Sequence, residues 1–201
     1  MFLPRAPRLT PPRPWSPLTD LQFHALLPYL LSRAPQGRHI ADLRARMDAI
    51  FRTTSAHAPW RETPPAYGKP DTIARHYRRL THAGLWERLL IGLADCEPDH
   101  PLRQIEHLIV RACRRAHRIL GIGFLVLIRR IGLRSALNGP PWLLPDPDLS
   151  ERLSRLPIPL KIPATPAGQR ERTDYLRALK HLFRAAEGRA RIPRSVRQAW
   201  P

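Results

Sequence analysis

Apolar residues recur at helical spacing along most of this chain. The clearest case runs from Ile40 to about Thr54, where apolar side chains fall on one side and charged ones mostly on the other. Further helices are predicted from Thr19 across a kink or end at Pro28, and over residues 72–81, 101–120 and 173–187. The second half lacks the β-branched runs from which a sheet is built. We therefore predict an all-α protein.

Residues 72–81 predict a strongly basic helix. Asp71 precedes it and can cap its first turn, because a carboxylate accepts hydrogen bonds from the open amides there. Gly84 is placed to end the helix in a left-handed turn. Three residues at i, i+4 and i+7 would form the buried stripe: Ile73, Tyr77 and Leu80. Four side chains then lie largely off the core face: Arg75, His76, Arg78 and Arg79. A basic face of this kind also fits an ordinary solvated helix, and spacing alone does not separate the two interpretations.

Several short motifs occur before, within and after this helix in a specific order. They are Leu18-Thr19-Asp20, Leu27-Pro28-x-Leu30-Leu31, Asp42-Leu43-Arg44 to Ile50, Pro59-Trp60-Arg61-Glu62-x-Pro64, Tyr67-Gly68, Thr72-Ile73, Arg75, Tyr77-Arg78-Arg79 and Gly84-Leu85-Trp86-Glu87-Arg88-Leu89-Leu90. From about residue 16 to 93 the chain thereby resembles the N-terminal domain of DDE-type insertion-sequence transposases of the IS-five group. The resemblance implies a compact helix-turn-helix, homeodomain-like domain that recognises transposon ends.

Together with the positive charge, the resemblance implies which residues contact DNA. Base or phosphate contacts are expected from the basic helix, namely from Thr72, Arg75, His76, Arg78 and Arg79. Arg61 and Lys69 are expected to hold the DNA backbone. The family usually has a glycine just before the tryptophan motif, where this chain has His57-Ala58-Pro59-Trp60. If that turn needs a positive φ, a histidine there is tolerable but strained. Trp60 fits a core anchor better than a base-stacking residue.

The charge balance agrees with a polyanionic partner. The 201 residues include 34 Lys plus Arg against 16 Asp plus Glu, a formal charge of +18. Such a field gives salt-sensitive, sequence-independent binding to nucleic acid, and it also attracts anionic membranes. The alternative function is therefore a basic helical interaction protein that binds a protein partner or an anionic membrane surface.

No catalytic site is predicted. A complete transposase of this type continues into an RNase-H-like domain whose Asp, Asp and Glu bind two divalent metals. The residues after Asp95 do not fit such a sheet, so we expect no enzyme and assign no catalytic residue, metal or cofactor. The chain would be a first-frame, truncated or domesticated product. The two cysteines, Cys96 and Cys113, lack the spacing of zinc ligands and favour a reduced, cytoplasmic protein. Binding to DNA would place this protein at the nucleoid.

The domain organisation follows from the same patterns. We predict a flexible basic arm (1–15), the helix-turn-helix domain (16–95), a basic amphipathic helical segment (96–137), a proline-rich linker (138–172), and an amphipathic helix with a basic tail (173–201). The second half would be a looser, Pro/Arg-rich extension. The ten-residue apolar run at 119–128 is too short to span a bilayer, so no transmembrane segment is expected. Expected partners are double-stranded DNA, including insertion-element terminal repeats, a separately encoded catalytic transposase subunit, and a second copy of the chain.

Overall fold

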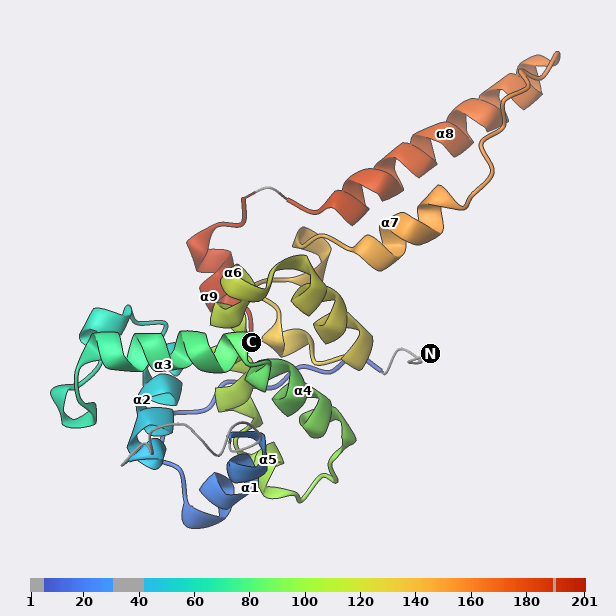
Figure 1. Ribbon diagram of the computed structural model, residues 1–201. Coiled ribbons are helices and arrows are strands. Elements are labelled where there is room, and N and C mark those ends of the chain that lie inside the picture. The colour runs from blue at the N-terminus through green and yellow to red at the C-terminus, as the bar shows by residue number, and fades with distance from the viewer. Residues whose placement is uncertain (1–5, 31–41, 190) are drawn as a thin grey trace. The chain divides into compact units, whose positions relative to one another are not determined.

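The computed structural model describes residues 6–30, 42–189 and 191–201, and the structural statements below concern these residues. Two compact units are present (Figure 1). Unit 1 comprises Met1–Asn138 together with Trp200 and Pro201, and unit 2 comprises Gly139–Ala199. The described ranges contain helices and one isolated bridge, between Arg8 and Leu133, but no sheet. The predicted all-α class is confirmed.

Six helices build the described part of unit 1. They are α1 (Asp20–Leu30), α2 (Leu43–Ser55), α3 (Pro70–His82), α4 (Leu85–Asp95), α5 (Pro101–Gln104) and α6 (Glu106–Ile131). Short 3-10 turns accompany them: η1 (Trp60–Glu62), η2 (Pro65–Tyr67) and η3 (Arg134–Ala136). Only Ala83 and Gly84 separate α3 from α4, whereas residues 56–69 connect α2 to α3.

The long helix α6 is the centre of the packing in unit 1. It lies against α2, α3 and α4, and its apolar residues share one core with theirs. The fully buried side chains of this core include Met47, Phe51, Ile73, Tyr77, Trp86, Leu89, Ile109 and Cys113. The predicted boundary after Asp95 therefore falls inside unit 1. Burial of apolar area is the main stabilising term in folding, so the segment after Asp95 is an integral part of this core.

Side-chain hydrogen bonds cap the first two helices of unit 1. The amide of Thr19 donates to the Gln22 side chain (3.0 Å), and the amide of Gln22 donates to the Thr19 hydroxyl (3.3 Å), so that the two residues form a capping box. Pro28 does not end α1, which continues to Leu30. The predicted helix start at Ile40 lies outside the described residues. Helix α2 begins at Leu43, and the Asp42 carboxylate accepts from the Ala45 amide (2.8 Å).

Helix α6 bends at a glycine. Gly121 has φ 66° and ψ −152°, a conformation open to glycine but strained for other residues. The apolar run at residues 119–128 thus spans the bend, and Arg129 and Arg130 follow it in the last turn of α6, which ends at Ile131. Within the described ranges, no helix is both long and apolar enough to cross a membrane.

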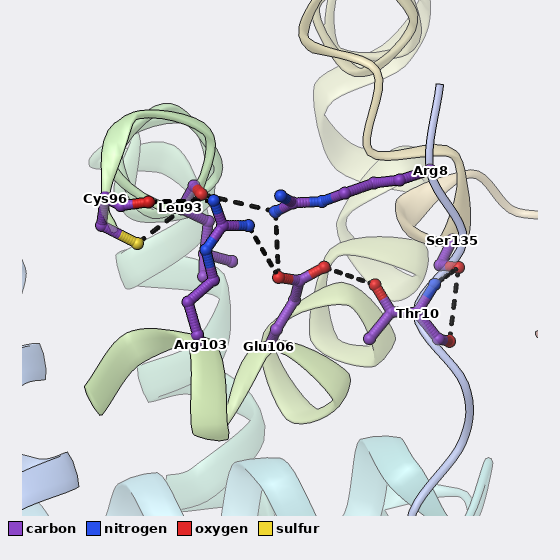
Figure 2. A network of polar contacts seen from close by, with 7 residues as sticks. All are labelled: Arg8, Thr10, Leu93, Cys96, Arg103, Glu106 and Ser135. Carbon is purple, nitrogen blue, oxygen red and sulfur yellow. Dashed lines mark hydrogen bonds and ion pairs between the residues drawn. The ribbon is translucent and has the colours of Figure 1, made fainter. Parts of the chain in front are cut away.

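The N-terminal segment is tied to unit 1 through Glu106 (Figure 2). This carboxylate is largely buried and accepts hydrogen bonds from Arg8 (2.9 Å), Arg103 (3.2 Å) and the Thr10 hydroxyl. The Thr10 amide also donates to the Ser135 hydroxyl (2.7 Å). Residues 1–15 were expected to form a flexible arm, yet Arg8 and Thr10 share a buried carboxylate with α6. A polar network is favourable in a buried site when its members satisfy one another.

A buried arginine holds Trp200 and Pro201 in unit 1. The side chain of Arg114 in α6 is buried although it is charged. Its Nε donates to the Ser135 carbonyl (2.7 Å), and its terminal nitrogens donate to the carbonyls of Trp200 (2.8 Å) and Pro201. Burial lowers the pKa of Arg114 to about 9, so the group remains charged at neutral pH. The three carbonyl groups replace the water that this charge loses.

Unit 2 is a helical hairpin with a short third helix. It contains the turn η4 (Pro141–Leu143) and the helices α7 (Pro147–Ser154), α8 (Pro166–Glu187) and α9 (Arg194–Ala199). Helices α7 and α8 lie side by side (Figure 1) and bury a small apolar cluster: Leu149, Leu153, Leu179, Phe183 and Ala186.

The element limits in unit 2 differ from the predicted ones. Helix α7 lies within the predicted linker and is capped by Asp146, which accepts from the Leu149 amide (3.0 Å). Helix α8 begins at Pro166 after a Thr165 cap, seven residues before the predicted start at Thr173. The range 138–172 therefore includes helices as well as linker, and the predicted basic tail contains α9. Proline is compatible with a helix at its first position, where no amide partner is lost, and both α7 and α8 use it there.

Candidate nucleic-acid interface

Helix α3, the predicted recognition helix, begins earlier than the sequence suggested. It runs from Pro70 to His82, with Pro70 in its first position and Lys69 before it. The prediction that Asp71 caps the helix is wrong, because Asp71 lies inside the first turn. Its carboxylate still stands at the positive end of the helix dipole. Gly84 follows the helix with φ 75° and ψ 25°, the predicted left-handed turn.

One side of α3 is exposed and basic. Arg75, Arg78 and Arg79 are exposed, and Thr72 lies on the same side because residues three and seven apart share a helix face. The opposite side carries Ile73 and Tyr77, each 1% exposed, as predicted. Leu80, the third expected member of the buried stripe, is only partly buried. Among the described residues, none forms an ion pair with the three arginines. Their guanidinium groups are therefore available for a polyanion.

His76 does not belong to this exposed face. Its side chain is buried, with 4% exposure, so its predicted place off the core face is wrong. Burial, together with the charges of Arg46 and Arg79, lowers the pKa of His76 to about 4. The ring is consequently neutral at physiological pH and contributes no positive charge to a DNA contact. Helices α2 and α6 both pack on α3, which widens the buried face beyond a single stripe.

Aromatic residues fix α3 from beneath. The Tyr77 hydroxyl donates to the Ala112 carbonyl of α6 (2.7 Å), and the Trp86 indole donates to the Thr81 hydroxyl (2.8 Å). The Tyr77 ring lies between two tryptophans, with centroid distances of 5.1 Å to Trp60 and 5.4 Å to Trp86. Such contacts add to area burial and orient the helix.

Trp60 has a packing role, as the sequence favoured. Besides its contact with Tyr77, its ring lies under the Arg115 guanidinium at 4.4 Å. Arg115 also donates to the carbonyl of Ala58 and so links α6 to the turn before η1. Helical periodicity does not reveal this contact, because Arg115 and Ala58 are far apart in the chain.

The turn that leads to Trp60 contains a strained histidine. His57 has φ 52°, and it is the one described residue other than glycine with a positive φ. Its Nε2 accepts a hydrogen bond from Arg111 of α6 (2.8 Å). The expected strain at this turn is thus located at His57. A residue in this conformation is retained when its surroundings hold it there.

Arg61 and Lys69 lie near the start of α3. Both are exposed and line a shallow depression of about 570 Å³ formed by residues 61–65 and 68–70. Gly68, also in the lining, has φ 93° and allows the chain to turn into the helix. Two cations at the positive end of a helix dipole suit an anionic ligand such as phosphate.

The chemical groups on this face suit anion binding. Arginine forks donate two parallel hydrogen bonds to phosphate or to guanine, and threonine donates or accepts one. In the described part of the chain, no three His, Cys, Asp or Glu side chains are placed to hold a metal ion. Cys96 and Cys113 are both free, and burial raises their pKa, so neither is an activated thiolate.

Comparison with known proteins supports the predicted relationship over the same region. Residues 18–90 match the model of a family described as "Putative transposase of IS4/5 family". The match extends from just before α1 to the middle of α4 and contains the whole of α3. This confirms the similarity to the N-terminal domain of insertion-sequence transposases. No curated protein and no solved structure gives a match.

Proposed function

We propose that this protein binds double-stranded DNA through α3, as the end-recognition domain of an insertion-sequence transposase does. The observation that carries the proposal is the exposed face of Thr72, Arg75, Arg78 and Arg79 on a helix whose other face is fixed in the core. The family match to residues 18–90 independently supports a transposase-related role.

Each group on this surface has a distinct part in the proposal. The three arginines of α3 contact guanine edges or phosphates, and Thr72 lies beside them near the helix start. Arg61 and Lys69 hold the DNA backbone from the depression that they line. A good bidentate base contact contributes about 1 to 3 kcal/mol of discrimination, whereas a phosphate contact adds affinity that salt weakens. Loss of a base contact should therefore reduce sequence preference, and loss of a phosphate contact should reduce the salt dependence of binding.

In this proposal α3 belongs to a helix-turn-helix arrangement, and residues 1–201 supply DNA binding. Strand cleavage and joining are supplied by a separately encoded catalytic subunit, and the protein acts at DNA in the cytoplasm, alone or as a homo-oligomer. A downstream reading frame that encodes an RNase-H-like domain would support this division between two proteins.

The test is DNA binding by the full chain, measured by fluorescence anisotropy over a salt series. Terminal repeats that flank the gene are compared with scrambled duplexes of the same composition. We expect preference for the repeats, and we expect the Arg75/Arg78/Arg79→Ala variant to lose it.

A matched control removes three exposed arginines elsewhere, as in Arg189/Arg191/Arg194→Ala. This variant should lose some affinity for all duplexes and keep the preference for the repeats. Equal binding to every duplex, with equal losses in both variants, would reject sequence recognition by α3. Unchanged DNA affinity in the α3 variant would instead favour the interaction-protein alternative.

A further inference from the structure

Helix α8 in unit 2 has two chemically distinct faces. One face packs against α7 through Leu179, Phe183 and Ala186. Arg172 and Tyr175 extend this inner face, because they donate to the carbonyls of Pro159 (3.0 Å) and Pro157 (2.9 Å) in the returning segment. At 100° per residue, the opposite face contains a separate set of residues.

That opposite face is a basic stripe. Its four members are all exposed: Arg170, Arg177, Lys180 and Arg184. Spacings of seven, three and four residues keep them on one side of the helix over about 21 Å. Arg177 forms an ion pair with Asp174 (2.9 Å), and both side chains of this pair are exposed. Exposed pairs of this kind contribute little, so a polyanion can replace Asp174.

We infer that the α8 stripe is a second nucleic-acid contact, which binds the phosphate backbone without regard to sequence. Cations on a rigid helix meet successive phosphates over several base pairs, because one strand of duplex DNA carries a phosphate every 3.4 Å or so. The inference concerns unit 2 alone and does not depend on sequence recognition by α3.

The packing of α8 favours nucleic acid over a membrane surface. A helix that lies in a membrane interface needs a free apolar face opposite its charges. On α8 that face is occupied by α7 and by the returning segment. The exposed aliphatic side chains of unit 2 lie mainly in that segment instead: Leu156, Ile158, Leu160 and Ile162. The stripe itself is charged and polar, as expected for a surface that follows phosphates.

The inference is tested in the full chain that already carries the Arg75/Arg78/Arg79→Ala substitutions, so that contacts of α3 do not contribute. Binding to a random 30-base-pair duplex is measured from about 50 to 200 mM salt. Neutralising the stripe with Arg170/Arg177/Lys180/Arg184→Gln should reduce affinity at least about tenfold. The salt slope should fall by up to about 3 to 4, because each lost phosphate contact removes about 0.9. Glutamine has a helix propensity close to that of arginine and lysine, so α8 should keep its fold, which circular dichroism will check.

The matched control removes four charges from other faces of unit 2, as in Arg152/Arg155/Arg189/Arg191→Gln. It should change the salt slope much less than the stripe variant does. If the salt slope fell equally in the two variants, the effect would come from net charge alone, and the inference would be overturned. An unchanged salt slope in the stripe variant would overturn it as well. Vesicles of phosphatidylglycerol and phosphatidylcholine form the last arm. If the stripe variant lost vesicle binding but kept DNA binding, the stripe would be a membrane contact.

Discussion

The hydroxyl of Tyr77 in α3 donates a hydrogen bond of 2.7 Å to the carbonyl oxygen of Ala112 in α6. Both residues are buried, and burial raises the pKa of Tyr77, so the hydroxyl keeps its proton and remains a donor. Ala112 lies beyond the end of the family match at residue 90. The proposed recognition helix is therefore held in place by a part of the chain outside the recognisable domain.

A fragment of residues 1–95 should not fold on its own. Removing α6 would expose the faces of α2, α3 and α4 that pack on it, and loss of that burial exceeds the marginal stability of a small domain. We expect the fragment to lack a cooperative thermal transition by circular dichroism, in contrast to the full chain. A sharp transition near that of the full chain would show that α6 is dispensable.

The substitution Tyr77→Phe tests the hydrogen bond between α3 and α6 without removing the aromatic ring. The change removes one buried hydrogen bond and keeps the ring contacts with Trp60 and Trp86, so the free energy of unfolding should fall by about 1 kcal/mol. Urea denaturation measures this loss. Tyr77→Ala should lose about 3 to 5 kcal/mol, because it also leaves a cavity among the aromatic rings. An unchanged free energy of unfolding in Tyr77→Phe would contradict a contribution of the hydroxyl.

The Arg114 side chain and residues 200–201 should be energetically coupled. Deleting Trp200 and Pro201 removes two carbonyl acceptors and leaves charged donors buried without partners. We expect the deletion to destabilise the wild type by about 2 kcal/mol more than it destabilises an Arg114→Met variant. The four proteins of this double-mutant cycle are compared by urea denaturation. Additive effects would mean that Trp200 packing, and not Arg114, holds this segment.

Gly188→Ala should unfold unit 2 selectively. Gly188 has φ 71°, and a β-carbon there would lie 2.6 Å from the backbone atoms C of Leu144 and N of Pro145. Backbone cannot move aside as a flexible side chain can, so we expect a loss of at least about 2 kcal/mol. Hydrogen exchange should show lost protection in α7 and α8 but not in unit 1.

Gly123→Ala provides the comparison for that experiment. A β-carbon at Gly123 meets no atom within 4 Å, and the residue lies in α6, where alanine is the better helix former. Stability should therefore remain the same or rise slightly. A similar loss in both variants would show that the close approach at Gly188 is not the cause.

Acid should destabilise unit 1 through His76. Its folded pKa is about 4, below the ordinary value of 6.5, so the unfolded chain binds more protons between these values. Stability is therefore complete above pH 6.5 and is lost as the pH falls toward 4. At pH 5 the expected loss from His76 is about 2 kcal/mol. Urea denaturation of wild type and His76→Gln at pH 7 and pH 5 should show a smaller pH effect in the variant.

His117 contributes to the same pH dependence. Burial lowers its pKa to about 4 as well, so it should account for a large part of the acid sensitivity that remains in His76→Gln. The double variant His76→Gln/His117→Gln should depend less on pH between 7 and 5 than either single variant, and His107, whose pKa burial also lowers, contributes to what remains. An unchanged pH dependence in all variants would exclude both histidines as its source.

The sequence alone determined the helical class, the local signals and the similarity of residues 18–90 to insertion-sequence transposases. Helical periodicity placed Ile73 and Tyr77 on a buried face, the Thr19–Gln22 box capped α1, and Gly84 took a left-handed conformation. These features depend on residues a few positions apart, so the chain encodes them locally. Strain in the turn before Trp60 was expected from the resemblance instead, because the family usually has a glycine there, and it is found at His57.

The tertiary structure alone decided which polar residues are buried and where the units divide. His76 and Arg114 stand at the edges of apolar stripes, and an edge residue is buried only if a second element covers it. For His76, both α2 and α6 pack on its helix; for Arg114, the partners are the carbonyls of Ser135, Trp200 and Pro201. These contacts join segments that lie far apart in the sequence, and periodicity within one helix contains no information about them.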